Sequence, residues 1–479
     1  MSVERQFSRG VAWMAVGNWI EQAVNFAVFV TLARLLGARD YGLLAMASVF
    51  IVLSESLVRE SLSEYLIAAH EDAVEDLNAT FWLLAGLGAV LALALAAIAP
   101  LAARTYGEAE VRLLILALAP SVLIVALNAV PVAILRRRME FRILSLRAIA
   151  GVVLGGIVGI GMALNGFGVW SFVGQWLTLI STNAVMAWTA VDWRPGLRTS
   201  RAHLARAARF GAQVLGLRAG ELAATQTPLL VIGATLGPEA TGLFSVAWRL
   251  VETLAFLIVT PLRQASQSAF AALTREGGDA GALLEDLIRL AALVALPFFT
   301  GLVVLAGPMI GLVFGEGWAG AAPVLAALGA MGVYICLARV QIAFCLAAGR
   351  AGQVAVLAWA AVFLMAVLIW VASRWGMVAV ALAVVGAHVG LWPFYFGAVA
   401  RLSGRSVARL VGGLWSPAIG AALMGLGVWL VAGQLDGRPP LTVLMIAVPA
   451  GIALYGLFAV VMMRDRFTLL LRLVRGHDG

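Results

Sequence analysis

The chain has 479 residues, 62% of them hydrophobic and only 12% charged, and its mean hydropathy is +0.99. A soluble domain carries about 25% charged residues, so this composition excludes a soluble globular protein. The net charge of +8 comes from arginines in short connections between apolar runs, so no nucleic-acid partner is expected. Each of these runs is about 18 residues or longer, enough to cross a bilayer as a helix. The composition therefore predicts an all-α, polytopic membrane protein.

About fourteen transmembrane helices are predicted from the apolar runs. The first run contains Asn18, Glu21 and Asn25 and lacks a cleavage site, so it is predicted to be a span rather than a signal peptide. In chain order the predicted spans are 11–33, 41–67, 78–102, 112–135, 143–164, 168–191, 208–234, 239–265, 285–313, 320–347, 352–373, 376–400, 408–432 and 441–463. The connections between them are too short to fold as separate domains.

Arginines mark one side of the membrane. They concentrate in the connections after the fourth, sixth and twelfth spans and in the C-terminal tail. These arginines are Arg136, Arg137, Arg138, Arg142, Arg194, Arg198, Arg201, Arg206, Arg209, Arg401, Arg405, Arg409, Arg464, Arg466, Arg472 and Arg475. Basic residues gather in cytoplasmic loops, so both termini are predicted to lie in the cytoplasm.

The chain also contains an internal repeat. Two landmarks recur after 200 positions and two more after 208, so the second copy gains about eight residues. The pairs are Leu36-Gly37 with Leu236-Gly237, Gly42-Leu43 with Gly242-Leu243, Tyr106-Gly107-Glu108 with Phe314-Gly315-Glu316, and Gly168-Val169 with Gly376-Met377. The repeat unit holds six spans, an even number, so both copies enter the membrane in the same direction as a parallel repeat.

This repeat predicts two six-helix lobes around a central cavity, followed by two extra C-terminal helices. The expected organisation is an N-terminal lobe over 1–192, a cytoplasmic linker over 193–207 and a C-terminal lobe over 208–401. Residues 402–479 then hold the last two spans and a cytoplasmic tail.

Polar stripes run along the first two spans of each lobe. Ionisable residues inside a membrane usually face a bundle interior or a wet cavity, so these stripes are candidate cavity linings. The candidate substrate-binding residues are Arg59, Arg249, Arg218, Arg263, Arg339 and Asn25. The candidate ion-coupling or salt-bridge residues are Glu21, Glu55, Glu221 and Glu252. A single Arg–Glu pair can equally be a structural staple between helices, but the full set on four spans favours a hydrated cavity. Permanently charged guanidinium groups suit phosphate oxygens, so an anionic substrate such as a lipid pyrophosphate or an acidic sugar is expected.

Other polar residues carry simpler interpretations. His388 is expected to be a packed, hydrogen-bonded histidine, and Cys336 and Cys345 are expected to be buried thiols. No nucleophile motif, phosphate-binding glycine loop or zinc motif is present, so no cofactor, metal or catalytic residue is predicted.

Several stretches together resemble the bacterial polysaccharide repeat-unit flippases of the multidrug/oligosaccharidyl-lipid/polysaccharide exporter superfamily. These are LARLLGARDYGLLAMA from Leu32, DLNATFW from Asp76, ILRRRMEFR from Ile134, GFGVWSFVGQ from Gly166 and VFGEGWAGAAPVL from Val313. The resemblance extends from the first span to the tenth. It implies two six-helix lobes, a bacterial inner-membrane location, and alternating-access transfer of undecaprenyl-pyrophosphate-linked oligosaccharides for surface polysaccharide synthesis. By position, Arg59 and Arg249 best match the arginines that contact the pyrophosphate in related flippases.

The leading hypothesis is thus a non-enzymatic flippase whose partners are the lipid-linked oligosaccharide, membrane lipids, and the polymerase and glycosyltransferases of a polysaccharide cluster. A multidrug antiporter of the same fold and a non-transporting partner of a synthesis complex are the alternatives. A membrane-embedded polymerase or glycosyltransferase would need a larger extramembrane domain or an acidic catalytic loop. The energy source is left open between an ion gradient, the membrane potential and a reaction that consumes the product.

Overall fold

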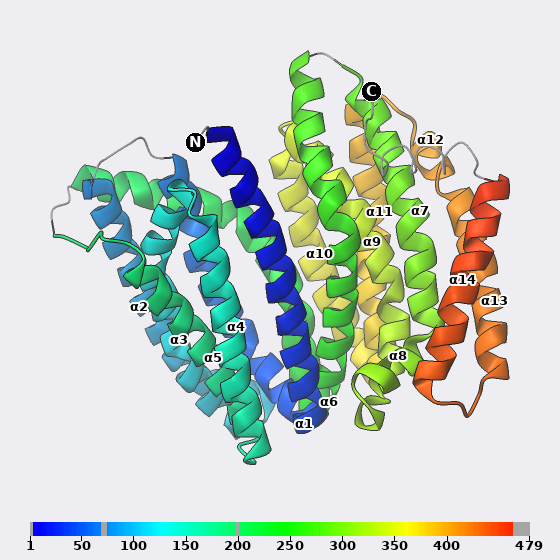
Figure 1. The fold of residues 1–479 in the computed structure, drawn as a ribbon, viewed down its shortest axis with the longest axis horizontal. Helices are drawn as coiled ribbons and strands as arrows, with labels where there is room; N and C mark the ends of the chain where they lie inside the picture. Colours follow the sequence, from blue (N-terminus) through cyan, green and yellow to red (C-terminus); the bar gives the residue numbers. More distant parts are fainter. Residues whose placement is uncertain (1–2, 69–73, 198–200, 277, 463–479) are drawn as a thin grey trace. The chain divides into compact units, whose positions relative to one another are not determined.

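The computed structural model describes residues 3–68, 74–197, 201–276 and 278–462 (Figure 1). The regular structure of these residues is entirely helical. The helices are α1 (Val3–Ala68), α2 (Val74–Tyr106), α3 (Ala109–Arg137), α4 (Phe141–Leu164), α5 (Trp170–Thr189), α6 (Arg201–Glu276), α7 (Ala280–Val304), α8 (Ala306–Val313), η1 (Glu316–Trp318), α9 (Ala321–Ala347), α10 (Ala351–Ala372), η2 (Ser373–Trp375), α11 (Met377–Ser403), α12 (Val407–Gly412), α13 (Trp415–Gln434) and α14 (Pro440–Met462). This confirms the expected all-α fold.

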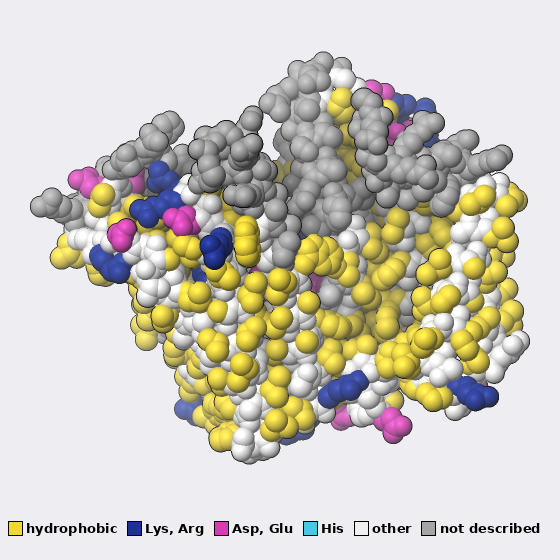
Figure 2. Space-filling view, in the orientation of Figure 1, with side chains coloured by type: hydrophobic (Ala, Val, Ile, Leu, Met, Phe, Trp, Pro, Cys, Tyr) yellow, Lys and Arg dark blue, Asp and Glu magenta, His cyan; other side chains and the backbone are white. Residues whose placement is uncertain are grey.

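Eleven segments of the described chain are long and apolar enough to cross a membrane. Two of them, Gly17–Arg59 and Leu222–Ile258, span 43 and 37 residues, about twice what one crossing needs. Each of these segments contains one non-helical glycine, Gly37 or Gly237. Counting each as two crossings and adding the 20-residue α5 recovers the fourteen predicted spans. On the face shown in Figure 2, hydrophobic side chains cover the flanks of the helices and charged side chains gather toward their ends.

The long helix α1 is a hairpin that turns at Gly37. The Phe29 and Tyr41 rings lie on either side of this corner with centroids 5.5 Å apart, which a continuous helix would prevent because twelve residues rise about 18 Å. Gly37 has φ 79° and ψ 178°, and Gly237 in α6 has φ 81° and ψ −173°. These angles lie in a region that only glycine adopts readily. The first repeat landmark is therefore the same helix corner in both copies.

The corner after Gly37 packs against the corner after Gly237 without intervening side chains. A Cβ atom at Gly42 would lie 1.7 Å from the carbonyl oxygen of Pro238, and one at Gly242 would lie 1.9 Å from that of Ala38. The second pair of repeated glycines therefore serves close backbone approach.

The described chain divides into two compact units, Met1–Gly242 and Leu243–Gly479. In the first unit, α2 packs on α3, α4 on α5, and α3 on α5, while α1 contacts α2, α3 and α4. In the second unit, the equivalent pairs α7 with α9, α10 with α11, and α9 with α11 pack in the same pattern, and α13 joins α7 to α14. Positive φ angles also recur at the equivalent positions Gly107 and Gly315 and at Gly168 and Gly376. The internal repeat is thus visible in the backbone and in the packing, whereas the lobe boundaries drawn from the sequence stay predictions.

Two predicted spans are interrupted. The span over 285–313 breaks at Leu305 into α7 and the eight-residue α8. The span over 408–432 breaks after Gly412, where the short α12 gives way to α13. Each break is followed by a proline in the first turn of the next helix, Pro308 in α8 and Pro417 in α13, although the apolar pattern continues on both sides.

Candidate functional site

Glu55 is the centre of a polar cluster in the first unit. Its residue is only 4% exposed, although it lies in the second half of α1 within an apolar helix. Its Oε1 accepts hydrogen bonds from the Ser121 hydroxyl at 2.7 Å and from the Trp176 indole N–H at 3.1 Å. Its Oε2 lies 3.3 Å from a terminal nitrogen of Arg59. These three donors, from three helices, offset the desolvation cost of burying the carboxylate.

Arg59 extends from this buried carboxylate to the surface of the unit. Its side chain is 57% exposed, whereas that of Glu55 is 5% exposed. The expected i, i+4 pair between the two residues is therefore present. The pair places a cation at the edge of the unit with its counter-ion buried beneath it.

Glu21 and Arg147 extend the same cluster. Glu21 is half-buried on the first half of α1, and the charges of Arg147 and Arg59 both act on its carboxylate. Arg147, on α4, is half-buried, and its Nε has no hydrogen-bond partner among the described residues. Arg136, at the end of α3, adds a further positive charge near Arg147. Arg147 was not among the sequence candidates, because a single arginine near the start of a span is typical of a topology anchor.

A second cluster lies in the second unit. The charges of Arg339 on α9 and Arg249 on α6 both act on Glu252, and the Trp248 indole hydrogen-bonds to this carboxylate from one turn earlier. All three charged residues are exposed. The structure therefore brings together Arg249, Glu252 and Arg339, which the sequence placed on different spans.

For four of the predicted site residues, the structure adds little to the sequence. Asn25 is half-buried on α1, and its assignment to substrate binding stays a prediction. The side chains of Arg218, Glu221 and Arg263 lie outside the part of the chain that the structure describes.

His388 and the two cysteines have packing roles, as expected. The His388 Nδ1 lies 2.9 Å from the Val384 carbonyl oxygen, and its ring packs edge-on against Tyr334 with centroids 5.0 Å apart. Cys336 and Cys345 are buried free thiols. Among the described residues, no group of three or more His, Cys, Asp or Glu side chains is placed to hold a metal ion.

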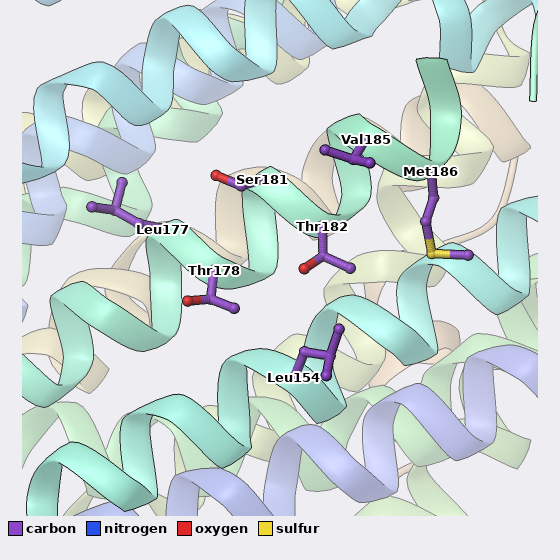
Figure 3. A pocket seen from close by; sticks show the side chains of 7 residues that line it. All are labelled: Leu154, Leu177, Thr178, Ser181, Thr182, Val185 and Met186. Atoms are coloured by element: carbon purple, nitrogen blue, oxygen red, sulfur yellow. The ribbon is translucent and has the colours of Figure 1, made fainter. Parts of the chain in front are cut away.

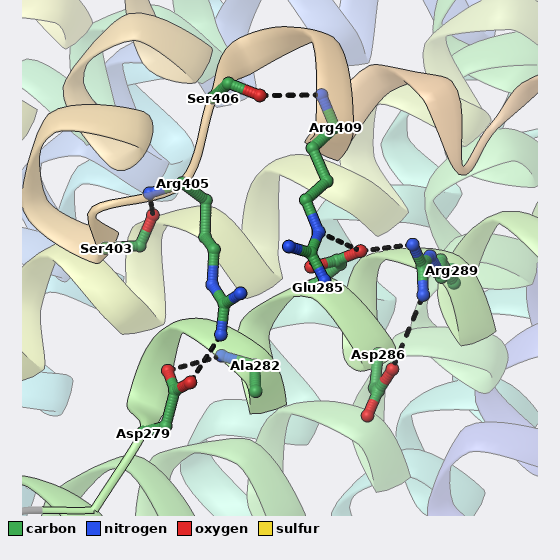
Figure 4. A network of polar contacts seen from close by, with 9 residues as sticks. All are labelled: Asp279, Ala282, Glu285, Asp286, Arg289, Ser403, Arg405, Ser406 and Arg409. Atoms are coloured by element: carbon green, nitrogen blue, oxygen red, sulfur yellow. Dashed lines mark hydrogen bonds and ion pairs between the residues drawn. The ribbon is translucent and has the colours of Figure 1, made fainter.

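A third polar cluster was missed by sequence analysis (Figure 4). Glu285, near the start of α7, is 4% exposed and binds Arg289 and Arg409, the latter through Nε at 3.0 Å. Asp279 caps α7 by accepting the Ala282 backbone N–H at 2.9 Å and also pairs with Arg405. These contacts fix the connection between α11 and α12 onto α7, so the cluster joins the last helices to the rest of the second unit.

A groove of about 520 Å³ lies between α4 and α5 (Figure 3). The α5 hydroxyls of Thr178, Ser181 and Thr182 line it together with Leu154, Leu177, Val185 and Met186. It contains none of the predicted site residues and no charged side chain.

Solved structures with a similar fold are membrane transporters. The lipid II flippase MurJ in an inward closed conformation matches with a TM-score of 0.79 and 13% identity, covering 96% of this chain and 99% of MurJ. A multidrug resistance MATE family transporter of the MOP superfamily, in an inward-facing conformation, matches with a TM-score of 0.55 and 19% identity over 85% of this chain and 97% of that one. The class of protein is therefore a polytopic helical membrane protein with the two-lobe fold of these transporters.

The sequence comparisons define the family. Residues 31–323 match the family described as polysaccharide biosynthesis protein, and the chain belongs to that family. The succinoglycan biosynthesis transport protein ExoT of Rhizobium meliloti is 23% identical over 67% of this chain, and the match spans 65% of ExoT. The teichuronic acid biosynthesis protein TuaB of Bacillus subtilis is 23% identical over 73% of each chain. The lipopolysaccharide biosynthesis protein WzxC of Escherichia coli is 22% identical over 70% of this chain and 68% of WzxC. The resemblance found in the sequence is confirmed at the level of the family.

Proposed function

We propose that the protein is a flippase that translocates undecaprenyl-pyrophosphate-linked oligosaccharide repeat units across the inner membrane by alternating access, for surface polysaccharide synthesis. Family membership supports a role in polysaccharide synthesis, and the name of ExoT supports transport. The fold shared with the lipid II flippase supports a substrate that carries a lipid.

Arg59 is the observation on which the proposal depends most. A cation within a membrane-spanning segment is costly and usually serves an ion or substrate pathway. Its side chain is half-exposed and forms an ion pair with a buried carboxylate. The guanidinium therefore lies at the surface of the unit rather than in its interior. A guanidinium group binds phosphate oxygens with matched geometry, which a cationic drug would not use.

The clusters around Arg59 and around Arg249 would both contribute cations that bind the substrate. We assign phosphate binding to Arg59 and Arg249, with Arg339 and Arg147 as further cations. Glu21 and Glu252 would balance these charges in the empty state or carry a coupling ion. Both termini would lie in the cytoplasm, and a polymerase and glycosyltransferases would use and supply the lipid-linked saccharide.

Surface polymer in cells that carry the double variant Arg59→Ala with Arg249→Ala tests the proposal. We expect loss of polymer at normal protein level, because two phosphate-binding cations are removed. Arg39→Ala is the matched control, since Arg39 also lies on α1 and its side chain is also 57% exposed. Normal polymer in the double variant would overturn the assignment of phosphate binding to Arg59 and Arg249. Drug efflux by membrane vesicles without any effect on polymer would favour a multidrug antiporter. Purified protein that moves no labelled lipid-linked saccharide in liposomes would favour a non-transporting partner.

A further inference from the structure

The contacts on Glu55 separate its two carboxylate oxygens by role. Both donors to Oε1 are neutral groups from other helices, Ser121 on α3 and Trp176 on α5. The oxygen that faces Arg59 is Oε2, at 3.3 Å. Ser121 is completely buried, so its hydroxyl belongs to the packed interior of the unit. Oε1 is therefore held by a buried hydroxyl and a half-buried indole, and Oε2 is directed at the arginine.

An i, i+4 ion pair alone would not fix the arginine well. Such a pair at a helix surface contributes little to stability, and both side chains sample several rotamers. Here the glutamate cannot change rotamer without breaking the bonds to Ser121 and Trp176. Ligand-binding groups gain most when their own partners are locked by packing and hydrogen bonds. Glu55 therefore acts as a fixed tether for Arg59.

We propose that Ser121 and Trp176 are positioning residues that hold Glu55 and, through it, aim Arg59 at the phosphate of the substrate. This inference rests on the proposed function. The inference also assigns Glu55 a different role from Glu21 and Glu252. Because three donors already bind its carboxylate, Glu55 is a structural partner of Arg59 rather than a site for a coupling ion.

Two substitutions each remove one of the two donors to Glu55. Trp176→Phe removes the indole N–H, and Ser121→Ala removes the hydroxyl. In liposomes that contain undecaprenyl pyrophosphate bearing a fluorescent saccharide, each substitution is expected to raise the KM for translocation about tenfold, since a lost hydrogen bond to a charged group commonly has that effect on binding. The kcat is expected to change less, because the transport path itself is intact.

The same substitutions in an Arg59→Ala background provide the decisive comparison. If Ser121 and Trp176 act through Arg59, they no longer change KM once the guanidinium is absent. Trp392→Phe is the matched control, since Trp392 also donates an indole N–H at 3.1 Å, but to the neutral Gln341. We expect it to leave KM unchanged. Thermal unfolding of each variant reports any general loss of stability, and Ser121→Ala serves if Trp176→Phe does not fold.

The outcomes distinguish the two proposals. Wild-type protein that moves no labelled lipid would refute the proposed function itself. Wild-type protein that moves lipid, with Ser121 and Trp176 variants whose effects on KM are equal in both backgrounds, would refute the positioning role alone. Unchanged KM in both variants would also refute it.

Discussion

Asn78, in the first turns of α2, accepts a hydrogen bond from the backbone N–H of Gly196 at 3.0 Å. The Trp82 indole donates to the carbonyl oxygen of the same glycine, also at 3.0 Å. Asn78 is 2% exposed and lies in the DLNATFW stretch that identified the family. Both polar groups of the Gly196 backbone are therefore satisfied by α2, which holds the segment after α5 in place.

We expect Asn78→Ala to lower the free energy of unfolding by about 1–3 kcal/mol, because the half-buried backbone N–H of Gly196 loses its partner. Denaturant titration of the purified protein in detergent measures this change. Asn165→Ala is the control, because Asn165 is exposed and hydrogen-bonds only within its own helix end, to Gly161. Its effect should stay within about 0.5 kcal/mol, and equal effects of the two substitutions would contradict the assignment.

Gly42→Ala and Gly242→Ala should each destabilise the protein by about 3 kcal/mol or more. The added Cβ meets a backbone carbonyl oxygen in both cases and cannot be accommodated by a rotamer change. Gly86→Ala is the matched helical control, since a Cβ there meets nothing within 4 Å, and it should be neutral or stabilise by up to about 1 kcal/mol. Unfolding midpoints that fall equally for all three variants would show that the corners do not touch.

Glu285→Gln tests the cluster that joins the last helices to α7. Loss of the buried charge leaves Arg289 and Arg409 without their shared counter-ion, and we expect a destabilisation of about 2 kcal/mol. The neighbouring Asp286→Asn is the control, because that side chain is 57% exposed and lies 3.8 Å from Arg289. An exposed pair of this kind contributes at most a few tenths of a kcal/mol. Similar losses for both substitutions would argue against a special role of the buried carboxylate.

Glu21→Gln should change the kinetics of translocation rather than the fold. Removing a negative charge that acts on Arg59 and Arg147 strengthens the attraction for a phosphate. We expect KM to fall about three- to tenfold and turnover to fall as well, since a more tightly held substrate is released more slowly. Gln22→Ala is the control, because Gln22 is exposed on a different side of the same helix. An unchanged KM in liposomes would remove Glu21 from the site.

Most of the fold could be predicted from the sequence because each span carries its own signal. Apolar run length gives the crossings, and the repeated Gly37 and Gly42 give the corner. The sequence could not show that the corners meet, because Gly42 and Gly242 are two hundred positions apart and their contact depends on the fold. The breaks at Leu305 and after Gly412 were missed because the spans were predicted from the length of the apolar runs, and the helix-start prolines Pro308 and Pro417 were not used.

The candidate site could be predicted only where its partners are close in sequence. Glu55 and Arg59 are four positions apart and share a helix face, so their pair was visible. Ser121 and Trp176 each stand on an apolar helix, where a serine can equally bond its own backbone and a tryptophan can simply pack. Their contacts with Glu55 arise from helix packing, which hydrophobic periodicity does not specify. Glu285 and Arg289 carry the same i, i+4 signal and were overlooked, whereas the contact of Glu285 with Arg409 on α12 arises from helix packing.

The corner contact between Gly42 and Gly242 joins main chain to main chain, so side-chain chemistry does not enter it. The two copies could therefore diverge in charge around the contact while keeping their shared geometry. Position 34 is arginine in one copy and position 234 is alanine in the other, and Arg39 corresponds to Glu239. A duplicated scaffold that is joined through main chain alone can therefore carry opposite charges at equivalent positions of its two copies.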